Sequence, residues 1–351
     1  MQTGFADLPL HYGTCPKWLF EKMVRLGQAI SELIVEEFSE NEFLRRLSDP
    51  FFFQAFGCVL GFDWHSSGLT TTVCGALKEA LNNLNLGVYI AGGKGSTSKK
   101  TPEDILKFGE KLNLSPEKIN ELIKASRLSA KVDSALVQDN YNLYHHVFIF
   151  TKDNWAVIQQ GMNSYNRYAR RYHWLSENVK QFTETPHLAI CAQNIEKKVL
   201  NLTAKESRET KSCSLDLVND QEAPKQINKI LTMPKYHHLK NEFNINCETL
   251  QRAAEIQPAN YEELLMIRGF GPKHVRALAL ISNLIYGSEV SWKDPANYSF
   301  AHGGKDGTPF PVDEKLYENS IVTLQEAINN AKINSKEKLL ALKRLGENYN
   351  L

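Results

Sequence analysis

The sequence has six cysteines but lacks the spacings that would pair them. No CxxC pair occurs among Cys15, Cys58, Cys74, Cys191, Cys213 and Cys247. A disulfide framework or a structural zinc site would need cysteines at regular or paired spacings. We therefore expect reduced thiols in a reducing compartment, with neither a disulfide framework nor a cysteine-based zinc site.

Long apolar runs are also missing. No stretch reaches the roughly 18 apolar residues that a membrane span requires. The N-terminus lacks the basic region and following apolar run of a signal peptide. We expect a cytoplasmic protein that does not enter a membrane.

The chain carries almost no net charge. Its 41 Lys and Arg residues oppose 40 Asp and Glu residues, which gives a formal net charge of +1 over 351 residues. A general electrostatic attraction to nucleic acid is excluded, so any such affinity must come from local patches. The length suffices for two domains with a substantial buried core.

The stretch 260–288, NYEELLMIRGFGPKHVRALALISNLIYGS, predicts two helices joined by a tight turn. Gly269 and Gly271 can both take positive φ at that turn, and apolar residues recur at helical spacing after it. Backbone amides around the glycines would lie at a helix N-terminus, where the helix dipole favours an anion. Lys273 and Arg276 add positive charge on the same side.

This stretch resembles the helix-hairpin-helix motif of DNA repair and recombination proteins, through Gly269, Phe270, Gly271 and the Pro-Lys pair that follows. In that family the hairpin holds a phosphate of the DNA backbone without reading the sequence. The resemblance implies that Gly269, Phe270, Gly271, Lys273 and Arg276 contact nucleic acid without sequence specificity. The family favours DNA over RNA, and the sequence itself leaves the choice open. A pair of helices that serves only for packing is the alternative.

Two further stretches carry positive charge in patterns that suit nucleic acid. The glycine-rich loop around Lys94 could hold a phosphate through its amides, although a mobile surface loop is an alternative. The stretch NSYNRYARRYHW places Arg167, Arg170 and Arg171 among aromatic residues, which suits phosphates and stacked bases. A solvated basic face with aromatic side chains packed beneath it is equally compatible with this pattern.

Carboxylate and imidazole side chains lie beside apolar segments in the first half of the chain. They are Asp63, His65, Asp133, His145 and His146, with Asp139 as a further candidate. Such ligands can position a divalent metal and water for in-line attack on a phosphodiester. The sequence thus predicts a metal-dependent nuclease in DNA repair or processing, with these residues at its centre. A structural His-His pair is the alternative.

The metal ligands of this predicted centre are Asp63, His65, Asp133 and His146. Mixed oxygen and imidazole ligands suit Mn²⁺ or Mg²⁺, with Zn²⁺ also open. Lys131 would lie on the same side as Asp133 if that segment were extended, and it could then stabilise charge in the transition state.

Two other functions stay open at this point. DNA glycosylases of the helix-hairpin-helix class resemble this chain in a lysine after the hairpin, here Lys273, and in an essential carboxylate at a helix start, here Asp313 in the sequence Pro-Val-Asp. The separation of these two residues is longer than in that family. The third possibility is an accessory protein that binds DNA without any chemistry.

Seven blocks spread over nearly the whole chain resemble the prokaryotic family labelled domain of unknown function 763. They are LPLHYG, DPFFFQAFGCVLGFDWHSSG, YIAGGKG, SRLSAKVDSALVQDNYNLYHHVFIFT, QQGMNSYNRYARRYHWLSE, LNLTA and AHGGKDGTPFPVD. This resemblance implies kinship and no particular activity.

Together these patterns predict an α+β fold. We expect a mixed N-terminal domain at 1–200, a polar linker or surface excursion at 201–228, and a helical DNA-binding domain at 229–351 that holds the hairpin at 260–288. Strands are expected at 147–150 and 155–159, because polar turn residues separate two apolar stretches. The sequence leaves the oligomeric state open.

Overall fold

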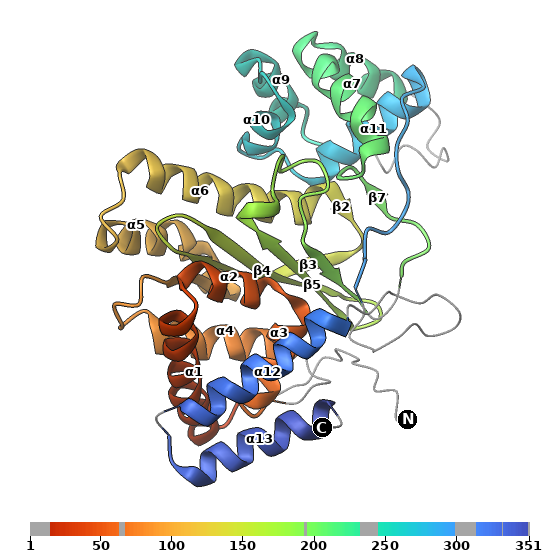
Figure 1. Cartoon of the computed structure of the whole chain (residues 1–351). Coiled ribbons are helices and arrows are strands. Elements are labelled where there is room, and N and C mark those ends of the chain that lie inside the picture. The colour runs from red at the N-terminus through yellow and green to blue at the C-terminus, as the bar shows by residue number, and fades with distance from the viewer. Residues whose placement is uncertain are drawn as a thin grey trace.

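The computed structural model describes residues 15–62, 67–192, 195–231, 245–298, 314–331 and 333–349. Within these ranges the fold is α+β, as the sequence predicts. One antiparallel sheet of five strands lies between helices on its two faces (Figure 1). No helix in the described part of the chain is both long enough and apolar enough to cross a membrane.

The two strands predicted at 147–150 and 155–159 lie in the sheet as neighbours. In the order β1-β3-β4-β5-β6, its strands are β1 (Tyr89–Lys94), β3 (Tyr141–Phe150), β4 (Trp155–Asn163), β5 (Ala169–Leu175) and β6 (Ala189–Cys191). Phe150 pairs with Trp155, so only four residues connect β3 to β4. The Thr151 hydroxyl accepts hydrogen bonds from the amides of Asp153 and Asn154 in this turn. Both strand predictions are therefore confirmed.

One face of the sheet is covered by the first four helices and the last two. These are α1 (Lys17–Glu37), α2 (Glu40–Ser48), α3 (Pro50–Val59), α4 (Gly68–Leu81), α12 (Glu314–Asn330) and α13 (Ser335–Tyr349). Val147 and Ile149 point into their apolar core. The C-terminal helices α12 and α13 lie beside the N-terminal ones in Figure 1 and contact α1 and α3.

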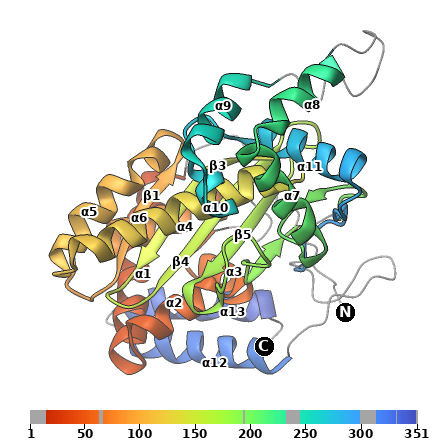
Figure 2. The same cartoon turned by 90° about the horizontal axis from the view of Figure 1, so that it is seen from above.

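The opposite face carries the helices that lead to the candidate sites. They are η1 (Gly95–Lys100), α5 (Thr101–Lys111), α6 (Pro116–Lys131) and the π-helical turn η2 (Val132–Leu136). Phe148 and Phe150 alternate with the residues of the first face and pack on this side. Figure 2 shows α6 passing over the strands, and α6 contacts both β3 and β4.

A second group of helices stacks on the α6 side. It comprises η4 (Lys205–Ser207), α7 (Arg208–Asn219), α8 (Glu222–Leu231), α9 (Cys247–Ile256), α10 (Tyr261–Met266) and α11 (Pro272–Tyr286). Its apolar side chains join the same core as β3, β4 and β5. The hairpin helices are thus packed onto the helices of the sheet.

Two short strands, β2 (Val137–Gln138) and β7 (Leu200–Asn201), pair as a second, antiparallel sheet. The short helix η3 (Ser176–Asn178) follows β5, and its Glu177 pairs with Arg45 of α2.

Two parts of the expected domain organisation need correction. The segment 201–228 is not a linker, because it holds α7 and α8, and α7 packs against α11. The segment 229–351 does not form one helical unit, because α12 and α13 belong to the core on the other face of the sheet. The chain therefore returns to its starting layer after the hairpin helices.

Candidate functional site

The predicted metal centre is only partly covered by the structure. Asp63 and His65 lie outside the described residues. Within the described ranges, no group of three or more His, Cys, Asp and Glu side chains is arranged to hold a metal ion. The structure does not join Asp133 and His146 as neighbouring ligands, since a glutamine side chain lies between them.

Asp133 is the centre of a buried hydrogen-bond network. It lies in η2 and is completely buried. Its Oδ2 accepts bonds from Gln159 Nε2 at 2.6 Å and from Trp174 Nε1 at 3.0 Å, and His187 Nε2 contacts its Oδ1. Burial raises the pKa of Asp133, while His187 and Trp174 act in the opposite direction. A π-helical turn of this kind is often found at functional sites.

His146 extends this network toward the surface. Its Nδ1 lies 2.9 Å from Gln159 Oε1, and its Nε2 lies 2.8 Å from the hydroxyl of Ser126. Gln159 uses its amide group to donate to Asp133, so its oxygen must accept from His146 Nδ1–H. In the neutral ring Nε2 then carries the lone pair and accepts a hydrogen bond from the Ser126 hydroxyl. Burial lowers the pKa of His146 to about 4, so the ring is neutral at neutral pH.

Ser126 and His146 open onto a cavity of about 400 Å³. The other lining residues come from η1, α5, α6 and β3, and they are Ser98, Lys99, Thr101, Pro102, Arg127, Ala130, Leu143, Tyr144 and His145. Lys99 and Arg127 are basic, and none of the described residues around this cavity is acidic. The cavity is therefore electropositive. We call it the serine cavity.

His145 lines the same cavity as His146, but its ring does not join the hydrogen-bond network of His146. The two residues alternate along β3, so their rings point to opposite faces of the sheet. Among the described residues, neither ring nitrogen of His145 has a hydrogen-bond partner. Burial lowers the pKa of His145 to about 3, with smaller contributions from His146 and Lys94. The structure thus brings both histidines to one cavity but does not turn their rings toward a common ligand.

Lys131 and Asp133 do not lie on one side of an extended segment, because the chain is helical there. The Lys131 ammonium group donates to the carbonyl oxygen of Phe270 in the turn between α10 and α11. Burial lowers the pKa of Lys131. This lysine therefore ties the hairpin to α6, and its predicted role beside Asp133 is not supported.

Arg170 and Arg171 are also placed differently from the expectation. Both lie on β5 with side chains that are completely buried. Arg170 bonds to Asp139 and Asp294, and Arg171 donates to Gln54, among other polar groups of the core. Neither can contact a nucleic acid at the surface.

Arg167, the third arginine of that stretch, is exposed in the turn before β5, with φ of 61°. Lys94 is exposed at the end of β1, and its ammonium group lies 6.0 Å from the ring centre of Tyr144. The glycines before it are part of the strand, and the amide of Gly92 already donates to Asp104. The glycine-rich segment is therefore a strand end, although Lys94 itself reaches solvent.

The turn between α10 and α11 differs in detail from the expectation. Gly269 has φ of 88°, in the left-handed region, whereas Gly271 is extended with φ of −146°. Phe270 is completely buried, and its ring lies 5.4 Å from that of His274. Its side chain fixes the turn from inside and cannot contact a ligand.

The N-terminus of α11 faces outward from this turn. Gly271 is its N-cap, and no side chain in the described part of the chain caps it. The first amides of a helix have no partner within the helix. Lys273 is exposed beside them, and Arg276 lies one turn further along.

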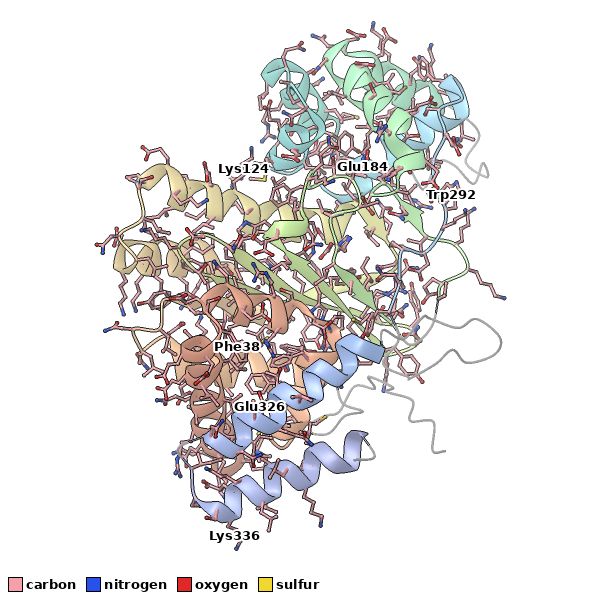
Figure 3. The ribbon with its side chains drawn as sticks, viewed as in Figure 1. Phe38, Lys124, Glu184, Trp292, Glu326 and Lys336 are labelled. Carbon is pink, nitrogen blue, oxygen red and sulfur yellow. The ribbon has the colours of Figure 1, made fainter. Side chains whose placement is uncertain are left out.

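A second electropositive cavity adjoins this helix start. It measures about 410 Å³ and is lined by Gln138, Asn140, Lys198, Leu200, Arg276 and Trp292. The Lys198 ammonium group lies 4.6 Å from the ring centre of Trp292. Gln138 donates to the carbonyl of Pro272, which connects the cavity wall to the turn. Trp292, labelled in Figure 3, lies beside β7, because its carbonyl accepts a hydrogen bond from the amide of Val199.

We refer to Gly269, Gly271, Lys273, Arg276, Lys198 and Trp292 as the hairpin surface. Sequence reasoning found the first four of these residues and missed Lys198 and Trp292, which lie outside the motif. It also missed Ser126 and Gln159. The one available signal was the pair of glutamines at the end of an apolar strand, AVIQQ, where a buried polar group must find a partner.

Comparison with known proteins identifies kinship and no activity. The model of a family described as "Protein of unknown function (DUF763)" matches residues 4–312. No curated protein and no solved structure matches the chain.

Proposed function

We propose that this chain, which belongs to the DUF763 family, binds the backbone of DNA through the hairpin surface. The observation that carries this proposal is the uncapped start of α11 beside a glycine turn, flanked by Lys273, Arg276 and the cavity that holds Lys198. The resemblance of this segment to helix-hairpin-helix proteins also supports binding to the DNA backbone.

The physical basis is a fixed set of donors for phosphate. Free amides at the start of a helix and the helix dipole both favour an anion at that point. Phe270 is buried and Lys131 holds its carbonyl, so the turn is already in place before a ligand arrives. Preorganised donors lose little conformational entropy on binding.

The positive charge of the hairpin surface is local. The whole chain has a net charge of only +1, whereas Lys273, Arg276 and Lys198 gather around one turn and its adjoining cavity. Contacts of lysine and arginine with phosphates give affinity that does not depend on sequence. The ring of Trp292 at the same cavity offers a face on which an unpaired base could stack.

The reactions predicted from the sequence stay predictions. The metal-dependent nuclease relies on Asp63 and His65, and the glycosylase relies on Asp313, all outside the described residues. The accessory role without chemistry needs the hairpin surface alone. All three would use that surface to hold DNA.

A titration of labelled duplex with Lys273→Ala tests the proposal. We expect weaker binding to unrelated sequences by a similar factor, and a plot of log affinity against log salt whose slope falls by about one unit, because one phosphate contact is lost. Lys336→Ala is the matched control, since Lys336 is exposed on α13 at the opposite end of the molecule (Figure 3). Equal affinity and slope in the Lys273 and Lys336 variants would contradict the proposal. Single-stranded DNA and RNA of the same sequence complete the comparison.

A further inference from the structure

We infer that Ser126 is a nucleophile that cleaves phosphodiesters at the serine cavity, with His146 as its base. Ser126 and His146 both line this cavity, and their Oγ and Nε2 atoms are 2.8 Å apart. That the phosphodiester belongs to DNA rests on the proposed function; the nucleophile itself does not.

The hydrogen-bond network determines which group donates and which group accepts in each bond from Asp133 to Ser126. Asp133 accepts from the Gln159 amide, the Gln159 oxygen accepts from His146 Nδ1–H, and His146 Nε2 is left to accept from Ser126. A serine hydroxyl becomes a useful nucleophile when an oriented base lies within hydrogen-bond reach. The arrangement meets this geometric condition through residues of α6, β3 and β4 and the turn η2.

The hydrogen bond of the Ser126 hydroxyl is unusual for a serine inside a helix. Mid-helix serines commonly bond back to the carbonyl one turn earlier. Ser129 and Ser48 do so, with bonds to Ser126 O and Leu44 O respectively. Ser126 instead turns its hydroxyl to a histidine on the sheet and remains at the cavity wall.

The lining of the cavity favours phosphoryl over acyl transfer. Lys99 and Arg127 lie on its walls, and no acidic residue is found among the described lining residues. Charge on the equatorial oxygens of a phosphoryl group is stabilised by such lysine and arginine side chains. Acyl transfer develops charge on a single oxygen, which a pair of backbone amides usually stabilises.

The serine cavity and the hairpin surface are mechanically connected. Ser126 and Lys131 lie five residues apart on α6, which is about 7.5 Å along the helix axis. Lys131 holds the carbonyl of Phe270 in the hairpin turn. A nucleic-acid backbone bound at this turn would therefore lie at a fixed distance from Ser126.

Hydrolysis of a phosphodiester by Ser126 needs water as its one co-reactant. As the Ser126 Oγ–P bond forms, the Oγ proton moves to His146 Nε2. The P–O bond to the leaving strand breaks, and the leaving oxygen takes the electron pair and then the proton from His146. Water next attacks the phosphoserine, and its proton passes through His146 to Ser126 Oγ as the Oγ–P bond breaks. One phosphodiester and one water give a phosphate monoester and a hydroxyl end.

A fluorophosphonate probe tests the nucleophile without DNA, because its phosphorus accepts the serine oxygen while fluoride leaves. We expect one adduct per chain, located on Ser126 by peptide mass spectrometry, and no adduct in Ser126→Ala. Labelling should fall by about 100-fold or more in His146→Gln, since a positioned base contributes that much. Ser134→Ala is the matched control, because Ser134 is exposed a few residues further along the chain.

Urea unfolding of each variant shows that it is folded before labelling is compared. Absence of an adduct on Ser126 in the folded wild-type chain, or equal labelling in folded His146→Gln, would overturn the inference. Incubation with labelled DNA in the presence of a chelator should give cleavage that Ser126→Ala abolishes. An adduct without DNA cleavage would overturn the phosphodiester assignment, and lost DNA binding in Lys273→Ala reports separately on the hairpin surface.

Discussion

Replacing Arg170 with alanine is expected to lower the free energy of unfolding by about 3–5 kcal/mol, because it leaves buried carboxylates without their cation. Arg170 bonds to Asp139 at 2.8 Å and to both oxygens of Asp294, the nearer at 2.7 Å. All three side chains are at most 1% exposed. Urea denaturation followed by circular dichroism measures the change.

Arg167→Ala is the control for this prediction. It removes the same type of side chain from the same stretch, but Arg167 is exposed in the turn before β5. Its free energy of unfolding should change by less than about 1 kcal/mol, as is typical of surface positions. Similar losses in the two variants would show that Arg170 does not hold a buried ion pair.

Replacing Phe270 with alanine is expected to cost about 3–5 kcal/mol of stability, the range for removing a buried phenylalanine. Phe270 is completely buried in the core that α10 and α11 share with the sheet. Its removal should also weaken DNA binding, because the turn that presents Gly269 and Gly271 loses its inner support. Unfolding and DNA titration of the same preparation measure both effects.

Phe270→Leu and Tyr165→Ala separate the causes of these effects. Leucine retains much of the apolar volume, so the loss of stability should be smaller than with alanine. Tyr165 is 90% exposed, and its truncation should leave stability almost unchanged. Full stability of Phe270→Ala would contradict the packing described for the turn.

Local patterns in the sequence were sufficient for the sheet hairpin and for the α10–α11 pair. The strands β3 and β4 follow from two apolar stretches with polar residues between them, and only four residues need to turn. The turn before α11 follows from glycine and proline at adjacent positions. These features are determined by residues that are neighbours in the chain.

The buried arginines could not be recognised in this way. A stretch that alternates arginine with aromatics looks the same whether the arginines face solvent or an internal partner. Asp294, which neutralises Arg170, lies 124 residues away in the sequence. Ser126 and His146 are 20 residues apart, and Asp133 and Gln159 are 26 apart, which is still beyond any local pattern. These buried hydrogen bonds therefore emerge only from the fold.

The prediction of a linker or surface excursion at 201–228 is wrong for a related reason. Its polar composition is typical of a linker, but α7 buries several polar side chains that have partners in the fold. The Thr210 hydroxyl bonds to the carbonyl of Glu289, and Ser214 Oγ lies 3.2 Å from Ser282 Oγ on α11. Burial lowers the pKa of Lys211 to about 8 while its ammonium group donates to Thr183. Polar residues can form a helix interface when each one is satisfied.

Amide hydrogen exchange with and without a DNA duplex tests the central claim most directly. In the proposed complex the amides of Gly269, Gly271 and Lys273 lie against a phosphate, so their exchange should slow when duplex is added. Exchange in α13, at the opposite end of the molecule, should stay the same (Figure 1). Binding of the duplex with unchanged exchange at these three amides, and slowed exchange elsewhere, would contradict the account.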